Sequence, residues 1–418
     1  MNLLYHIALR FYYSIIYIVG PFNRKAFLFY HGRVGLLENI REQVKSDEPI
    51  VWFHCASVGE FEQGRPVIES YKKHNPSHKI LLTFFSPSGY ELRKNYPLAD
   101  WVFYLPMDIK RNAASFLDAV KPSMAIFIKY EYWFNYLYGL KKRGVPTYVA
   151  SAIFMRNQRF FKWYGGLFRG MLKTFTHIFV QDQTSADLLK TIGITNVTVS
   201  GDTRFDRVYQ ITKANGQLEH IRIFAEGSPC WVAGSTWPVD EEMIAAIFAD
   251  LPYNKLIIAP HEVHQKHIAK IIACFPNCEV IKYSQIKDLK VNPEIEVRLR
   301  EARVLIIDTI GVLSTVYKYG SFAYIGGGFG TSIHNTLEAA TYGIPVMFGP
   351  KYNKFREAVD LVNLGGARSI KNTVELDLQT KQFLLDNEVR SKCGAICREY
   401  IEKNVGATEC VTEHLLLK

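Results

Sequence analysis

The chain has 418 residues, 48% of them hydrophobic, and a formal net charge of +10 with a pI near 9.0. Its length favours two domains of roughly 200 residues, and its hydrophobic content excludes a disordered protein because it suffices for two cores. The charge favours an anionic partner, but basic residues are spread along the chain, which argues against nucleic-acid binding. The seven cysteines have no zinc-site spacing and predict reduced thiols in the cytoplasm.

The first predicted element is an apolar, aromatic segment over residues 3–19, interrupted by His6 and Arg10. It is short for a spanning helix, which needs about 20 apolar residues, and no signal-peptide cleavage site follows. Its tyrosines, with Arg24 and Lys25 just beyond, are typical of a helix seated at a membrane interface. We therefore expect residues 1–25 to form a membrane anchor helix that either spans or lies on the bilayer. A helix packed on the protein itself is the alternative.

From residue 50 onward, short apolar runs alternate with helical patterns such as 61–74 and 112–120. This rhythm predicts an α/β protein with doubly wound parallel sheets. We expect a first domain over 26–205, a polar linker over 206–228, and a second domain over 229–418 that includes C-terminal helices. The predicted strands are 50–54, 79–85, 101–105, 124–129, 146–150, 177–181 and 197–201 in the first domain, and 230–234, 255–259, 303–308, 322–326 and 346–349 in the second.

Glu60 lies at the junction between the first predicted strand and the helical pattern that follows it. Ser57 and Glu60 have the S-x-x-E spacing of a capping box, in which each side chain satisfies a backbone N–H at the helix start. Alternatively, Glu60 is catalytic, because the functional residues of open α/β sheets lie in the loops after the carboxyl ends of parallel strands. The local sequence leaves both interpretations open.

The run from Tyr324 to Pro350 contains a predicted strand that ends in glycines, followed by His334, Asn335 and a helix with Glu338 in its first turn. Glycines allow a backbone to approach a ligand, and N–H groups at a helix start bind phosphate. The run does not match the dinucleotide fingerprint. We interpret it as a phosphate-binding loop, with Glu338 placed to accept ribose hydroxyls. An ordinary tight turn is the alternative.

Two other strand ends are predicted to lie at the same edge of the second sheet. Pro260 and His261 follow one strand, and Asp308, Thr309 and Gly311 follow another. The cluster of His261, Glu262 and His264 is not the H-E-x-x-H zinc motif. Together with the glycine run, these strand ends predict a nucleotide pocket.

Several motifs follow one another along the chain: ASVGE (56–60), EYW-F-N (131–135), GDTRFD (201–206), AGST (233–236), DTIG-L (308–313), and HN-LEA with G-PV-FGP (334–350). Taken in this order, they resemble the Kdo transferase family, the 3-deoxy-D-manno-octulosonic acid transferases of lipopolysaccharide assembly. The resemblance runs from the N-terminal segment to about Pro350. It implies two facing Rossmann-like domains of the GT-B type, with CMP-Kdo as donor and a lipid A precursor as acceptor. We expect neither cofactor nor metal, because helix N-termini and basic groups can hold the donor phosphate in this architecture.

The resemblance also implies roles for individual residues. Glu60 becomes the general base of an inverting transfer, removing the proton of the acceptor hydroxyl. His261 stands where many relatives carry Arg, Val312 replaces a usual Glu, and Lys129 and Ser151 depart from the family pattern on the acceptor side. The implied CMP contacts are Pro260, His261, Gly311, Val312, Leu313, Asn335, Thr336, Leu337 and Glu338, with Gly327, Gly328 and His334 as donor-loop candidates.

The segment 155–173 contains both basic and aromatic side chains. This composition is typical of a segment that docks on an anionic membrane face and binds a phosphorylated lipid. A core helix with a solvated basic face is the alternative. We take Arg65, Glu131, Arg156 and Arg159 as acceptor-side candidates.

The expected protein is thus an inverting glycosyltransferase that moves Kdo from CMP-Kdo to lipid IVA. It is expected at the cytoplasmic face of the inner membrane, in contact with the phospholipid surface and with no nucleic acid. The alternatives are a GT-B enzyme that uses another nucleotide sugar on a lipid acceptor, a nucleotide-sugar epimerase, and a non-catalytic lipid A binding protein.

Overall fold

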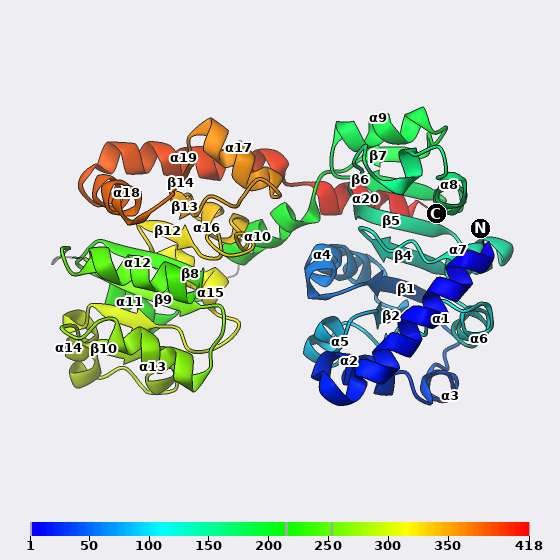
Figure 1. Ribbon diagram of the computed structural model, residues 1–418, viewed down its shortest axis with the longest axis horizontal. Helices are drawn as coiled ribbons and strands as arrows, with labels where there is room; N and C mark the ends of the chain where they lie inside the picture. Colours follow the sequence, from blue (N-terminus) through cyan, green and yellow to red (C-terminus); the bar gives the residue numbers. More distant parts are fainter. Residues whose placement is uncertain (1, 214–215, 252–253, 418) are drawn as a thin grey trace. The chain divides into compact units, whose positions relative to one another are not determined.

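The computed structural model describes residues 2–213, 216–251 and 254–417. The chain folds into two compact units (Figure 1). Unit 1 comprises Met1–Arg207 and Asn404–Lys418, and unit 2 comprises Val208–Lys403. Each unit is built on its own seven-stranded sheet, in which every strand pairing is parallel. The α/β class with two parallel sheets is therefore confirmed.

The strands of unit 1 lie in the order β3-β2-β1-β4-β5-β6-β7. The chain thus runs outward from β1 in one direction and resumes on its other side with β4, so the strand order reverses between β1 and β4. In open α/β sheets, ligands bind outside the carboxyl ends of the strands at such a switch point. The strands are β1 (Ile50–Cys55), β2 (Lys79–Phe84), β3 (Trp101–Tyr104), β4 (Met124–Ile128), β5 (Thr147–Ala152), β6 (His177–Val180) and β7 (Val197–Val199).

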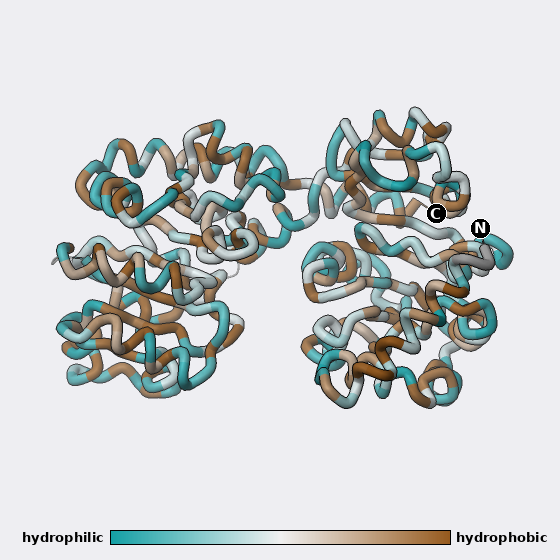
Figure 2. The backbone as a smooth tube through the Cα atoms, in the orientation of Figure 1, coloured by the Kyte–Doolittle hydropathy of each residue, from teal (hydrophilic) through white to brown (hydrophobic). Residues whose placement is uncertain are grey.

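Both faces of this sheet are buried, which explains why its strands are continuous apolar runs. Successive residues of β1 point to opposite faces, so Trp52 belongs to one core cluster while Val51 and Phe53 belong to the other. The hydrophobic strands at the centre of each unit are visible in Figure 2. The helices of unit 1 are α1 (Asn2–Val19), α2 (Arg24–His31), α3 (Leu36–Gln43), α4 (Val58–His74), α5 (Pro87–Arg93), α6 (Lys110–Val120), α7 (Phe134–Lys142), α8 (Gly166–Leu172), α9 (Gln183–Thr191) and α20 (Ala407–Leu416).

Unit 2 repeats the plan with the strand order β10-β11-β9-β8-β12-β13-β14. Here the order reverses between β8 and β12. The strands are β8 (Cys230–Thr236), β9 (Lys255–Pro260), β10 (Val280–Lys282), β11 (Val304–Ile306), β12 (Phe322–Ile325), β13 (Val346–Phe348) and β14 (Ala367–Ser369). The helices are α11 (Glu219–Ala225), α12 (Pro238–Phe248), α13 (Gln265–Ala273), α14 (Pro293–Glu301), α15 (Leu313–Val316), α16 (Leu337–Ala340), α17 (Arg356–Leu364), α18 (Thr373–Leu385) and α19 (Asn387–Asn404).

The domain boundaries differ from the sequence expectation in two respects. The expected linker 206–228 contains helices α10 (Thr203–Lys213) and α11, and most of it belongs to unit 2. The last helix, α20, belongs to unit 1 and not to the second domain, because Val411 and Leu415 complete a core cluster of unit 1. Asp206 fixes the start of α20 by accepting hydrogen bonds from the N–H groups of Gly406 and Thr408 at 2.6 and 2.7 Å.

Helix α1 lies along unit 1 and runs toward α2 (Figure 1). Tyr5 attaches its start, since the Tyr5 hydroxyl donates to the Asp108 carboxylate and its ring packs against Phe134. Within the described residues, no helix has both the length and the apolar character needed to cross a membrane. A row of exposed apolar side chains nevertheless runs along the first segment, at Ile7, Phe11, Ile15, Ile18 and Phe22.

Candidate active site

Glu60 lies in the first turn of α4, directly after β1 and therefore beside the switch point of unit 1. Its side chain is half-buried. Ser57 precedes α4 but makes no side-chain cap; its hydroxyl donates instead to the Glu60 carboxylate. The capping-box interpretation is therefore wrong. Gly59 is exposed, and a Cβ there would have only the Ser57 hydroxyl oxygen near it, at 3.8 Å, so no bulky group covers this side of the turn.

The other side of this switch point is formed by the residues after β4. Lys129 has the left-handed φ of +66°, which is costly for a residue with a side chain, and its ammonium lies 5.3 Å from the centre of the Tyr130 ring. Burial raises the pKa of Tyr130, and the Glu60 carboxylate raises it further, while Arg204 lowers it. Glu60 and Tyr130 therefore belong to one electrostatic environment.

Glu131 is held in a network of aromatic side chains. Its carboxylate lies 3.0 Å from Nε2 of His54 and accepts a 2.7 Å hydrogen bond from the Trp133 indole. His54 is buried in β1, and its Nδ1 lies 2.8 Å from the Thr83 hydroxyl. These contacts fix the segment after β4 against β1, so the structure accounts for Glu131 as a support for the site.

Arg65 has partners of its own on α4. Its Nε donates to Glu69 at 2.6 Å, and its guanidinium lies 6.0 Å from the centre of the Tyr96 ring. Five positions on a helix of 3.6 residues per turn separate it from Glu60, so the two side chains leave different faces. The structure therefore does not bring Arg65 together with Glu60.

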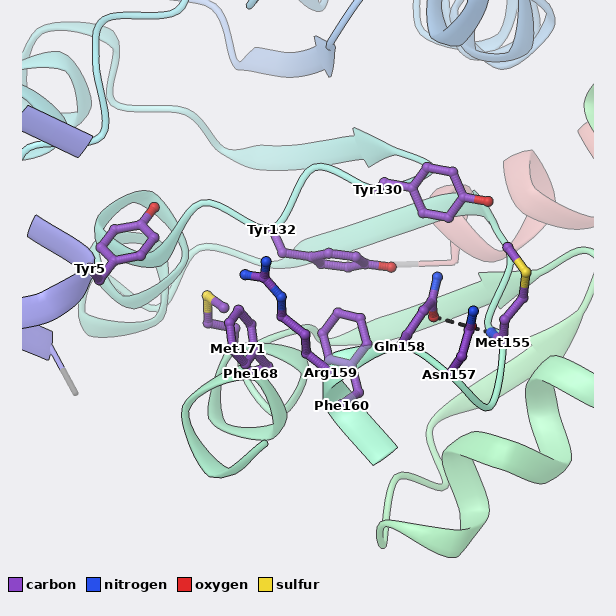
Figure 3. Close-up of a pocket in the computed structure, with 10 residues that line it drawn as sticks. All are labelled: Tyr5, Tyr130, Tyr132, Met155, Asn157, Gln158, Arg159, Phe160, Phe168 and Met171. Carbon is purple, nitrogen blue, oxygen red and sulfur yellow. Dashed lines mark hydrogen bonds between the residues drawn. The ribbon is translucent and has the colours of Figure 1, made fainter. Parts of the chain in front are cut away.

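A cavity of about 650 Å³ lies in unit 1 next to Tyr130 (Figure 3). Its walls are largely aromatic and apolar, and Arg159 contributes a charge, with its guanidinium 5.6 Å from the centre of the Phe168 ring. Met155 also lines a second cavity of about 580 Å³, which contains Arg156. The lining residues of the first cavity are Tyr5, Tyr130, Tyr132, Met155, Asn157, Gln158, Arg159, Phe160, Phe168 and Met171.

In unit 2, the glycines after β12 are required by close backbone packing. A Cβ at Gly326 would lie 2.3 Å from the Ser235 carbonyl oxygen, and one at Gly328 would lie 2.6 Å from Gly349. The Gly327 N–H donates to the buried carboxylate of Asp240 at 3.0 Å, so this amide is already occupied by the protein. The tight-turn interpretation thus accounts for much of the glycine run.

Three aromatic rings from three strand ends meet at the switch point of unit 2. Trp237 follows β8, His261 follows β9, and His334 follows β12. The His261 ring lies 4.3 Å from that of His334 and 4.8 Å from that of Trp237, close to parallel with both. The Trp237 indole donates to Nε2 of His334 at 3.1 Å. Sequence analysis missed Trp237, although it directly follows the AGST motif.

The remaining donor-side candidates lie at the same edge of the sheet. Asn335 donates to Glu338 at 3.0 Å and accepts from the N–H of Leu337. Thr336 and Leu337 have no exposed surface, so neither presents a side chain to a ligand. The helix predicted after Asn335 is α16, which spans Leu337–Ala340.

The strand ends of β9 and β11 complete this edge. Pro260 is the buried last residue of β9, and Gly311 is exposed with φ +98° and open space around it. Val312 and Leu313 begin α15. Among the described residues, no group of three or more His, Cys, Asp or Glu side chains is arranged to hold a metal ion.

Known proteins are similar to this chain in sequence and in fold. Residues 30–207 match the family model described as 3-deoxy-D-manno-octulosonic-acid transferase. The 3-deoxy-D-manno-octulosonic acid transferase of Aquifex aeolicus is 28% identical over 374 residues, which cover 87% of this chain and 95% of that protein. The chain is thus similar to Kdo transferases over most of its length. The Kdo transferase of Haemophilus influenzae is 24% identical and covers 86% of this chain, with 84% of its own length matched.

Solved structures show the fold at lower identity. The UDP-GlcNAc 2-epimerase from Neisseria meningitidis, bound to UDP-GlcNAc, superposes with a TM-score of 0.57 at 17% identity, covering 88% of this chain and all of that one. Because the identity is low, this likeness establishes the architecture alone. The architecture thus also occurs in a protein of another activity, which leaves the site residues to decide the reaction.

Proposed function

We propose that this protein is an inverting glycosyltransferase that moves Kdo from CMP-Kdo to a lipid A precursor, lipid IVA, in lipopolysaccharide core biosynthesis. The observation that carries the proposal is similarity to Kdo transferases along most of the chain, combined with Glu60 at the switch point of unit 1. The retained site residues argue against a non-catalytic lipid-binding protein, because Glu60, Asn335 and Glu338 are all present.

Glu60 is the general base of this proposal. Its carboxylate takes the proton from the acceptor hydroxyl as that oxygen bonds to the anomeric carbon of Kdo, while the bond from that carbon to the CMP phosphate breaks on the opposite face. CMP leaves with the bonding electron pair. The Ser57 hydroxyl, which donates to the carboxylate, orients it for this step.

The donor is assigned to the strand-end edge of unit 2. The departing CMP phosphate needs charge stabilisation more than a proton. His261, His334 and Asn335 provide polar groups there, and the exposed backbone at Gly311 allows close approach of the base. His261 replaces a permanent guanidinium charge with a titratable group.

The acceptor is assigned to the cavity beside Tyr130. Its aromatic and methionine walls suit an acyl chain, and Arg159 suits an acceptor phosphate. Tyr130 links this cavity to Glu60 because the Glu60 charge acts on the Tyr130 hydroxyl. Tyr5 of α1 also lines the cavity, which is consistent with an acceptor delivered from a membrane surface.

The deciding experiment measures CMP release from CMP-Kdo in the presence of tetra-acylated lipid A precursor, for the wild type and for Glu60→Gln. We expect turnover by the wild type and a loss of about 10²–10⁴-fold in the variant, with CMP affinity retained. Glu62→Gln is the matched control, since Glu62 lies on the same helix but pairs with Arg93 and Arg207. Equal rates for Glu60→Gln and the wild type would refute the assigned base.

Donor identity is tested separately by isothermal titration with CMP and UDP. We expect CMP to bind more tightly. A preference for UDP would support a GT-B enzyme that uses another nucleotide sugar, and absence of turnover with CMP-Kdo would refute the proposed reaction.

A further inference from the structure

We propose that Trp237 is a positioning residue of the donor site: its indole N–H holds His334 as the neutral tautomer with the proton on Nδ1. In this state, the His334 imidazole offers one N–H donor to an anionic oxygen of the sugar nucleotide, either on the phosphate or on the sugar carboxylate. The inference rests on the proposed function, because it takes the ligand to be a sugar nucleotide.

The arrangement of the Trp237, His261 and His334 rings fixes the orientation of the His334 side chain. The planes of Trp237 and His334 are 11° apart with ring centres separated by 6.4 Å, so the rings lie nearly parallel while their nitrogens meet at 3.1 Å. The His261 ring stacks over both partners. This stacking restricts rotation of the His334 ring and keeps its Nε2 directed at the indole.

The tautomer follows from the chemistry of the partners. An indole nitrogen only donates, so Nε2 of His334 must accept and cannot carry a proton. A neutral imidazole with an unprotonated Nε2 carries its proton on Nδ1. Burial, with a further contribution from His261, lowers the pKa of His334 to about 4, which keeps the ring neutral at physiological pH.

The backbone around His334 is built to admit the ring in this position. Gly327 has φ +92°, and a Cβ there would lie 3.2 Å from Cδ2 and 3.3 Å from Nε2 of His334. Trp237 follows β8 and His334 follows β12, the two strands at which the order of this sheet reverses. That is the place where open α/β sheets bind ligands.

The first experiment observes the tautomer without any ligand. Long-range ¹H–¹⁵N spectra of the full chain, labelled on histidine and recorded at neutral pH, should show His334 with a protonated Nδ1 and an unprotonated Nε2. His334→Gln identifies its signals by their loss. Trp237→Phe keeps a stacking ring but removes the N–H, so Nε2–H should become populated. Trp163→Phe, at a residue with 92% of its surface exposed in unit 1, should leave the His334 tautomer unchanged.

The second experiment measures CMP affinity and the CMP-Kdo KM for the same variants. We expect Trp237→Phe to weaken one or both by roughly 2- to 10-fold, as expected for the loss of one oriented hydrogen bond, with kcat at saturating donor nearly unchanged. Weaker CMP binding would place the anionic oxygen on the phosphate, whereas a raised KM with unchanged CMP affinity would place it on the sugar carboxylate.

Three results would overturn the inference. One is a wild-type His334 with its proton on Nε2, and another is a tautomer that Trp237→Phe leaves unchanged. The third is a changed tautomer with unaltered CMP affinity and KM. Failure of the wild type itself to bind CMP would instead refute the proposed function, and with it the donor role of this tautomer.

Discussion

At the scale of single residues, the Ser57 hydroxyl donates to the Glu60 carboxylate, although the spacing of these two residues is that of a capping box. Gly327 leaves space for the His334 ring, although it lies in a glycine run typical of phosphate-binding loops. In both cases the residue type was informative, but its partner was not the one its motif indicates. The reason is that a hydroxyl or a missing Cβ can serve several neighbours, and only the fold selects one.

Gly327→Ala should weaken donor binding and destabilise unit 2. A Cβ at this position would lie 2.5 Å from the Ser332 carbonyl oxygen, and φ +92° is strained for alanine, which costs about 1–3 kcal/mol. Urea unfolding and CMP titration measure the two effects. Gly330→Ala is the control in the same loop, because the nearest atom to its Cβ would be 3.5 Å away. Equal effects of the two substitutions would contradict this account.

The low pKa of His334 predicts an acid sensitivity of unit 2. The folded state protonates this ring only near pH 4, whereas an unfolded histidine does so near about pH 6.5. Between these values the unfolded chain binds the extra proton, so folding stability falls as pH decreases from about 6.5 to 4. His334→Gln should show a smaller loss of thermal stability across this window. An identical pH dependence in both proteins would exclude His334 as a contributor.

At the scale of an element, α1 presents an apolar row to solvent while its start is attached to unit 1 through Tyr5 and Asp108. A helix of this kind can lie in the headgroup region without crossing the bilayer. We propose that this row of apolar side chains binds the protein to the cytoplasmic face of the inner membrane. The basic residues Arg10, Arg24 and Lys25 support contact with anionic lipid.

Vesicle sedimentation tests this proposal. The double substitution Phe11→Ser and Ile18→Ser removes two side chains that are 68% and 66% exposed, and should release most protein from phosphatidylglycerol-containing vesicles. Val374→Ser with Leu378→Ser is the matched control, since it removes exposed apolar side chains from α18 in unit 2. Retention of the α1 variant on vesicles would contradict the proposed anchor.

At the scale of the whole molecule, the chain passes from unit 1 through unit 2 and returns to unit 1 with α20. Leu415 is 2% exposed in the core of unit 1, so Leu415→Ala should cost about 2–5 kcal/mol. Hydrogen exchange should show faster opening of amides in unit 1, with unit 2 unchanged. Leu417→Ala, at a residue 84% exposed, should have no such effect. Faster exchange confined to unit 2 would contradict this assignment.

The amino-acid sequence by itself determined the two parallel sheets and placed Glu60 after β1, because continuous apolar runs and strand-end motifs are local signals. It missed β10 and β14, because a charged residue, Lys282 in β10 and Arg368 in β14, interrupts the apolar pattern of each short strand. Tertiary structure alone decided the strand orders and the packing of α20 in unit 1. It also paired Trp237 with His334 across 97 positions of sequence. Such partners are selected by folding, and no spacing along the chain encodes them.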